Sequence, residues 1–150
     1  MKRYWILGSA AYFTLLWGMN TELCVNRSDS IAGAVFLTLK GCRSKKGDIV
    51  QIKDHAPKYY PKVSFTKRLM GIAGDEIRVK GQDISINDTY IGKTSSKTSF
   101  DKPLTPIKPG IIPAGYVFVA GDHERSYDSR YEEFGLVRQE NIKGRCLKIC

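Results

Sequence analysis

Three short segments of the sequence carry side chains that together could perform acyl transfer. They are residues 26–31 (NRSDSI), 63–67 (VSFTK) and 121–131 (GDHERSYDSRY). The first supplies two serine hydroxyls, the second ends in a lysine, and the third mixes serine with acidic and basic side chains. A serine acts as a nucleophile when a nearby base removes its proton, and an uncharged lysine amine is such a base. The chemistry therefore requires a fold that brings the three segments together.

The lysine of the second segment is expected to point inward. Alternation along VSFTK places Val63, Phe65 and Lys67 on one face of a strand and Ser64 and Thr66 on the other. Burial on an apolar face disfavours the charged amine and lowers its pKa, which suits a general base. The alternative is a lysine whose stem is buried while its ammonium group reaches the rim.

The other two segments are weak signals when each is taken alone. Ser28 and Ser30 in a Ser-x-Ser pattern are also typical of a polar linker or a helix cap. The third segment directly follows an apolar run, and a loop that leaves a core strand can position side chains well. Within it, Asp128 and Arg130 could pair and fix the loop, and Ser126 could hydrogen-bond a neighbour. An ordinary charged surface turn is the alternative.

The elements that must position these segments are predicted to be strands. Short apolar or alternating runs are separated by turn residues, and no long stretch of helical period follows residue 22. We therefore expect a mostly β, compact, barrel-like or sandwich-like domain. Residues 92–113 contain four prolines and are predicted to form a flexible loop. The predicted strands are 34–39, 48–52, 63–67, 75–80, 83–87, 89–92, 116–121, 135–138 and 142–149.

The N-terminal residues predict a membrane anchor. Lys2 and Arg3 precede an uncharged run over residues 4–21, which is about the minimum length that spans a bilayer as a helix. Positive charge before the run predicts a cytoplasmic N-terminus and an exported remainder. We expect an uncleaved anchor at 1–22 and a catalytic domain at 23–150. A cleaved signal peptide is the main alternative, but no small-residue cleavage pattern follows the run.

Composition limits the class of protein. The chain has 150 residues, 42% of them hydrophobic, and a formal charge of +9, which fits one globular domain with an anionic partner. Membrane headgroups and nucleic acid both satisfy that charge. The basic residues Lys40, Arg43, Lys45 and Lys46 could face headgroups, or could form a solvated surface.

Export would place the cysteines in an oxidising compartment, where disulfides form. Cys146 and Cys150 would lie about 13 Å apart along one strand, too far to pair with each other. Cross-pairing with Cys24 and Cys42 is therefore favoured. The cysteine and histidine spacing predicts no metal site and no cofactor.

Taken in order, these features resemble the type I signal peptidase family of Ser-Lys membrane serine peptidases. The resemblance covers the anchor, the Ser-x-Ser segment, the KRLMGIAGD segment, the GYVFVAGD and SYDSRY segments, and the closing IKGR. It is closest to the conjugative-transfer, TraF-like branch that processes pilins. Departures are Ala32 and Ala73, where the family usually has proline, and the inserted Glu132-Glu133.

The resemblance implies a role for each matching residue. Ser30 corresponds to the nucleophile, Ser28 to an oxyanion-hole hydroxyl and Lys67 to the general base. Ser126 corresponds to a serine that orients the lysine, and Asp128 and Arg130 to a supporting pair.

The resemblance also implies partners and location: an exported precursor, expected to be a pilin, and membrane lipid, with no nucleic acid. The catalytic domain would be periplasmic, on a single-pass protein of the bacterial inner membrane. The acyl-enzyme could be resolved by water or by the amine of the substrate's own N-terminus, which would close a ring.

Two other functions remain as alternatives. The first is a general type I signal peptidase, and the second is a non-catalytic, basic, membrane-anchored component of a secretion complex. Residues 64–67 also spell S-x-x-K, the motif of penicillin-binding enzymes, with Ser64 as nucleophile. We reject this interpretation, because the order of the motifs is reversed, no K-T-G follows, and the motif needs a helix whereas this segment alternates as a strand.

Overall fold

The computed structural model describes residues 20–26, 30–33 and 35–149. Nearly all regular structure within these ranges is β, joined by one short 3-10 turn (η1, Gln139–Asn141). The strands are β1 (Thr21–Val25), β2 (Val35–Lys40), β3 (Ile49–Ile52), β4 (Phe65–Gly71), β5 (Glu76–Lys80), β6 (Asp83–Ile86), β7 (Thr89–Lys93), β8 (Gly110–Ile111), β9 (Tyr116–Ala120), β10 (Val137–Arg138) and β11 (Ile142–Lys148).

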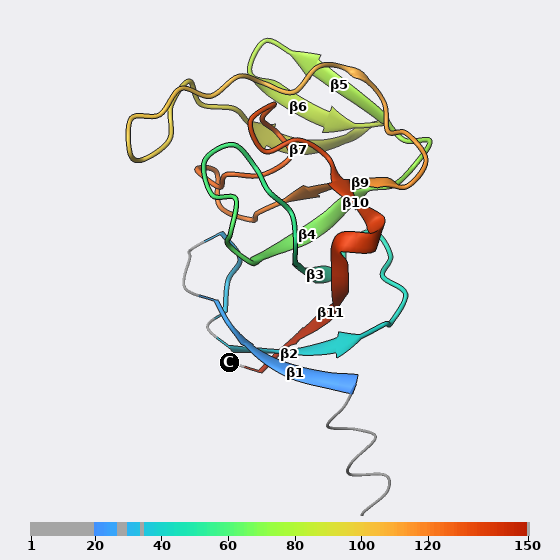
Figure 1. The fold of residues 1–150 in the computed structure, drawn as a ribbon. Coiled ribbons are helices and arrows are strands. Elements are labelled where there is room, and N and C mark those ends of the chain that lie inside the picture. Colours follow the sequence, from blue (N-terminus) through green and yellow to red (C-terminus); the bar gives the residue numbers. More distant parts are fainter. Residues whose placement is uncertain (1–19, 27–29, 34, 150) are drawn as a thin grey trace, which may run out of the picture.

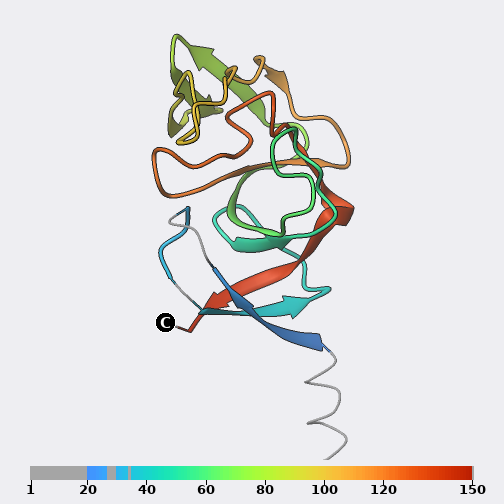
Figure 2. The ribbon, with the colours of Figure 1, turned by 60° about the vertical axis from the view of Figure 1, so that its left-hand side comes forward.

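These strands form two antiparallel sheets. The larger sheet has the order β1-β2-β11-β3-β4-β9-β10, and the smaller has the order β7-β6-β5-β8. The smaller sheet lies at one end of the molecule, and β1, β2 and β11 lie at the other (Figures 1 and 2). Strand β4 lies between these ends, so its side chains can take part in both the core and the site.

The larger sheet is strongly curved. Strand β1 is hydrogen-bonded only to β2 in the sheet order, and three strands, β2, β11 and β3, separate it from β4. Nevertheless the Cys24 thiol of β1 lies 3.6 Å from the Thr66 hydroxyl of β4. The sheet therefore curls until its first strand meets the far strand, which gives the barrel-like form that the strand pattern predicts.

Strand β9 explains why one predicted strand is apolar throughout. Val117 and Val119 pack in the core of the larger sheet. Phe118 and Ala120 point to the opposite side and pack in the core beneath the smaller sheet. A strand that is buried on both faces needs apolar residues at every position.

The mostly β prediction is confirmed, and each predicted run overlaps an observed strand. The Asn87 turn is also present, with a φ of 52° between β6 and β7. Strands β1 and β8 were not predicted. The 94–109 connection contains one isolated bridge, Lys97 to Pro103.

The predicted anchor at 1–22 lies almost entirely outside the described residues, and Thr21 and Glu22 already belong to β1. Among the residues that the structure describes, there is no helix with the length and apolar character to cross a membrane.

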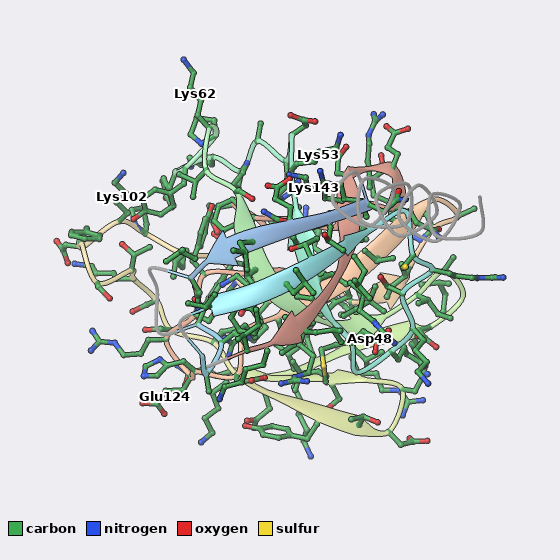
Figure 3. All side chains as sticks on the ribbon, turned by 90° about the horizontal axis from the view of Figure 1, so that it is seen from below. Asp48, Lys53, Lys62, Lys102, Glu124 and Lys143 are labelled. Carbon is green, nitrogen blue, oxygen red and sulfur yellow. The ribbon has the colours of Figure 1, made fainter. Side chains whose placement is uncertain are left out.

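The outer face of β1, β2 and β11 is apolar and exposed. Leu23 and Leu147 lie opposite Leu37 on its two sides. Leu23 is 66% exposed, and Val25, Leu147 and Ile149 are also exposed. Figure 3 views the molecule from this end, with the three strands across its near side. An apolar face of this kind indicates an interaction surface.

Candidate active site

Lys67 is buried in the middle of β4 and points at Ser126. Its side chain is only 2% exposed, and its Nζ donates a hydrogen bond of 2.6 Å to the Ser126 hydroxyl. The ammonium group therefore does not reach the rim. Burial lowers the pKa of Lys67 from 10.5 to about 8, and the nearby Asp128 carboxylate only partly opposes this shift. A pKa closer to neutral pH gives Lys67 a larger uncharged fraction than an ordinary lysine has, and the uncharged amine is the form that acts as a general base.

Ser30 lies in the turn that follows β1, and backbone groups of the third segment hold it there. Its carbonyl oxygen accepts hydrogen bonds from the Asp122 N–H at 2.6 Å and from the His123 N–H at 3.3 Å. Gly121 makes this approach possible: a β-carbon there would come within 2.7 Å of the Ser30 carbonyl oxygen and still closer to the Ser126 hydroxyl. The absence of a side chain at Gly121 lets Ser30 and Ser126 share one small region.

A second clamp acts on the other side of this turn. The Asn26 amide donates to the carbonyl oxygens of Ile31 at 2.9 Å and Gly33 at 3.2 Å. Ile31 itself is buried against Phe36. The nucleophile candidate therefore sits in a turn fixed both by packing and by hydrogen bonds.

Ser30 and Lys67 line the same cavity, of about 590 Å³. The cavity runs between β1 and the start of β4, and its walls are largely apolar. The other lining residues are Leu23, Cys24, Val25, Asn26, Gln51, Tyr60, Val63, Ser64, Phe65, Thr66 and Tyr127. A cavity of this size with mostly apolar walls and a few polar groups is typical of a ligand-binding site.

A smaller hollow of about 340 Å³ lies beside the same serine. It is lined by Ser30, Ser126, Ser99, His123 and Arg125. The Lys67–Ser126 hydrogen bond thus connects a residue of the larger cavity with a residue of the smaller one.

Asp128 and Arg130 form a fully buried ion pair behind the site. Arg130 Nε donates to one carboxylate oxygen at 2.9 Å, and Nη2 donates to the other at 2.8 Å. The second oxygen also accepts the Gly121 N–H at 2.8 Å. The pair thereby ties the end of β9 to the loop that carries Ser126.

The remaining donors of Arg130 bind backbone carbonyl oxygens. They reach Lys93, His123, Glu124 and Ser126, each at 3.2 Å. Three of these carbonyls belong to the loop around Ser126, so the guanidinium group serves as its internal scaffold. The sequence predicted the pair but not these contacts, because every residue has a backbone carbonyl group and the residue type does not show which of them accepts a hydrogen bond.

The structure therefore brings Ser30, Lys67, Ser126, Asp128 and Arg130 into one region. Ser28 lies outside the described residues. Sequence reasoning assigned no role to Asn26 or Gly121, although the Gly-Asp dipeptide at 121–122 was a visible signal. In the described ranges, no cluster of three or more His, Cys, Asp or Glu side chains could hold a metal ion.

The predicted disulfide cross-pairing is not present. Cys24, Cys42 and Cys146 are free thiols, and Cys150 lies outside the described residues. Cys24 instead contacts Thr66, and Cys146 lies 3.5 Å from the Thr38 hydroxyl. The two thiols therefore contact different threonines: Cys146 contacts Thr38, its cross-strand partner on β2, and Cys24 contacts Thr66 on β4.

Comparison with known proteins identifies the class. Residues 20–149 match the family model described as signal peptidase, peptidase S26. Signal peptidase I T of Bacillus subtilis (strain 168) is 30% identical, over 94% of this chain and 69% of that protein. Signal peptidase I of Bacillus amyloliquefaciens is 31% identical with the same coverage. A crystal structure of a signal peptidase I from Enterococcus faecalis V583 aligns with a TM-score of 0.45 at 22% identity, covering 69% of this chain and 97% of that one.

The family model and the two Bacillus relatives place the chain among the serine peptidases. More particularly, it belongs to the signal peptidase family, peptidase S26. The family membership predicted from the three segments is therefore confirmed, whereas the matches named above do not extend to the TraF-like branch.

Proposed function

We propose that this protein is a serine endopeptidase that cleaves exported precursors, with Ser30 as nucleophile and Lys67 as general base. The observation that carries the proposal is the buried Lys67 amine of lowered pKa, which lies in the cavity that Ser30 also lines. Family membership supports the same activity.

The reaction follows from these positions. The uncharged Lys67 amine removes the proton from the Ser30 hydroxyl, and the Ser30 oxygen forms a bond to the scissile carbonyl carbon. The Ser30 N–H and the Ser28 hydroxyl hold the resulting oxyanion. As the carbon–nitrogen bond breaks, the protonated Lys67 gives its proton to the leaving amine. Water, or an amine of the substrate, then attacks the acyl-enzyme and releases Ser30.

Ser126, Asp128 and Arg130 act as positioning residues in this proposal. Ser126 accepts the hydrogen bond that directs the Lys67 amine. The Asp128–Arg130 pair fixes the loop on which Ser126 lies. None of the three needs to touch the reacting atoms.

Replacing Ser30 with alanine is expected to abolish precursor processing, because no acyl-enzyme can form. The matched control is Ser64→Ala, whose hydroxyl donates to the Ile52 carbonyl oxygen at 2.9 Å and which should retain activity. Gel analysis of a precursor incubated with each purified variant measures both. Loss of activity in Ser64→Ala alone would support the S-x-x-K alternative, although residues 65–71 form a strand and not the helix that this motif needs. Full processing by Ser30→Ala would support the non-catalytic alternative.

Ser28→Ala should leave slow residual activity. Loss of one oxyanion donor typically lowers kcat by about 10² to 10³, while the nucleophile and base remain. Single-turnover kinetics on a saturating peptide would measure the change. An unaltered rate would remove Ser28 from the oxyanion hole.

Activity should rise with pH as Lys67 loses its proton. With a pKa of about 8, about a tenth of the amine is uncharged at pH 7 and about nine tenths at pH 9. We therefore expect kcat/KM to increase about tenfold over this range. His123→Asn is the control, because it removes the nearest imidazole and should keep the same profile. A flat profile between pH 6 and pH 9 would contradict an uncharged lysine base.

The narrower proposal for the substrate is a pilin precursor for conjugative transfer. It is supported by the resemblance of the GYVFVAGD and SYDSRY segments to the pilin-processing branch. Mass spectrometry of the mature product, made with and without Ser30, tests it. A product one water lighter than the linear chain would indicate ring closure by the substrate's own amine, and a linear product would indicate hydrolysis.

The site is proposed to work at the surface of the inner membrane, in the periplasm, with residues 1–22 as a single-pass anchor and 23–150 as the catalytic domain. The support is the exposed apolar face of β1, β2 and β11, which includes Leu23 and Val25. Both residues also line the cavity that holds Ser30. A lipid surface against this face would place the cavity where an exported chain emerges.

A further inference from the structure

The cavity that contains Ser30 has apolar walls but a polar inner end. Three polar side chains lie there, one each from β1, β3 and β4: Cys24, Gln51 and Thr66. Gln51 and Thr66 are cross-strand partners, so their side chains stand next to each other on one face of the sheet. The Cys24 thiol contacts the Thr66 hydroxyl from the opposite side.

The side-chain amide of Gln51 has a hydrogen-bond partner in the described part of the protein for its oxygen but none for its nitrogen. Its side chain is only 6% exposed, and its Oε1 accepts a hydrogen bond of 2.8 Å from the fully buried Thr38 hydroxyl. This bond fixes the amide plane and turns Nε2 away from Thr38. Among the described residues, none accepts a hydrogen bond from Nε2.

A peptide bound in the cavity changes the hydrogen bonding of the Gln51 amide nitrogen. In the free protein, the open cavity lets water accept the Nε2 protons. A substrate side chain that fills the inner end displaces the water, and an apolar side chain would then leave a buried donor without a partner. Sites built to hydrogen-bond a substrate discriminate strongly against analogues that lack the bonding group.

Resting on the proposed peptidase function, we infer that Gln51 selects precursors that carry a small, uncharged side chain with an oxygen acceptor beside the scissile bond. Serine, threonine and asparagine have this chemistry. The Thr66 hydroxyl next to Gln51 can donate or accept, so it completes the recognition of a hydroxyl or amide group. A charged side chain is disfavoured by its desolvation at the inner end of the cavity.

The test uses two side chains of equal shape. O-methylserine carries an ether oxygen that only accepts hydrogen bonds, and norvaline has a methylene group in its place. Each is placed in turn at the positions flanking the scissile bond of a precursor-derived peptide. We expect the wild type to prefer O-methylserine at one position by about tenfold in kcat/KM, which corresponds to about 1.4 kcal/mol.

Gln51→Met should reduce this preference to less than about twofold, because the ether oxygen loses its donor and the norvaline side chain no longer leaves a buried amide without a partner. Ser64→Ala is the matched control: it removes a hydroxyl of the same cavity that already donates to the Ile52 carbonyl oxygen at 2.9 Å, so the preference should remain. If Gln51→Met does not fold, the double variant Thr38→Val/Gln51→Met removes both partners and avoids an orphaned hydroxyl. Melting curves establish that each variant is folded.

Two results would overturn the inference. One is Ser30-dependent cleavage with no preference for the ether at any position. The other is an equal loss of activity of Gln51→Met on both peptides, which would mean that Gln51 binds the peptide backbone or only supports the sheet. Failure of the proposed function looks different, because cleavage would then be unaffected by Ser30→Ala.

Discussion

Replacing Lys67 with methionine is expected to abolish activity and, at the same time, to make the protein more stable. Activity should fall about 10³-fold or more, because the base is lost. The stability gain follows from burial: the folded protein holds the Lys67 pKa at about 8 instead of 10.5, which is equivalent to about 3 kcal/mol of unfavourable charge burial below pH 8. Methionine keeps the volume of the lysine stem but leaves the Ser126 hydroxyl without its donor, at a cost of about 1 kcal/mol. A net gain of about 1–2 kcal/mol at pH 7 is therefore expected.

The pH dependence of the free energy of unfolding tests whether Lys67 destabilises the folded protein, as this prediction states. Because the folded pKa of Lys67 lies below the unfolded value, the unfolded chain binds more protons between about pH 8 and pH 10.5. Wild-type stability therefore rises through this window, and the advantage of Lys67→Met shrinks. Urea unfolding at pH 7 and pH 10 measures both. The control is Lys62→Met, an exposed lysine that should behave like wild type. A Lys67→Met protein that is less stable than wild type at pH 7 would contradict a buried, destabilising amine.

The burial of Lys67 in a strand also explains why its role could be predicted from the sequence. A charged residue at an inward position of an alternating strand conflicts with the local pattern, and such conflicts are concentrated at functional sites. The strand runs around it were also predictable, because alternation is a local signal. Strand β8 was not, because its two residues, Gly110 and Ile111, lie in the proline-containing 92–113 stretch, which shows no alternation. Strand β1 has only half-buried and exposed residues, so its sequence TELCV carries no clear apolar face.

The part of the site that sequence could not reveal is made by the backbone. Ser30 is held by the N–H groups of Asp122 and His123, about ninety residues further along the chain. Any residue type except proline offers an N–H group, so no pattern marks these two. Likewise, the residue type of Ser126 predicted only a partner of some neighbour, and its role toward Lys67 came from the family resemblance. The bond itself follows from the pairing of Arg68 with Ala120, which places Lys67 beside the loop that leaves β9.

Breaking the buried Asp128–Arg130 pair is expected to have the largest effect on folding. In Arg130→Met, the Asp128 carboxylate remains fully buried with no cation, and four backbone carbonyl oxygens lose their donor. Removing one partner of a buried ion pair typically costs about 3–5 kcal/mol. For a chain of this size, that loss lowers Tm by about 10 °C or more. Calorimetry or circular dichroism melting would measure it.

A double variant separates charge burial from loop support. Arg130→Met with Asp128→Asn removes the isolated carboxylate, and the asparagine carbonyl oxygen can still accept the Gly121 N–H. If uncompensated charge dominates, the double variant should recover much of the lost Tm. If the guanidinium contacts to the loop dominate, the double variant should remain as unstable as the single one. Arg78→Met, which removes an exposed arginine paired with Glu76 and Asp88, should leave Tm nearly unchanged. If Arg130→Met has the Tm of the wild type, the loop around Ser126 keeps its structure without the Arg130 contacts. Arg130 would then have no part in positioning Lys67.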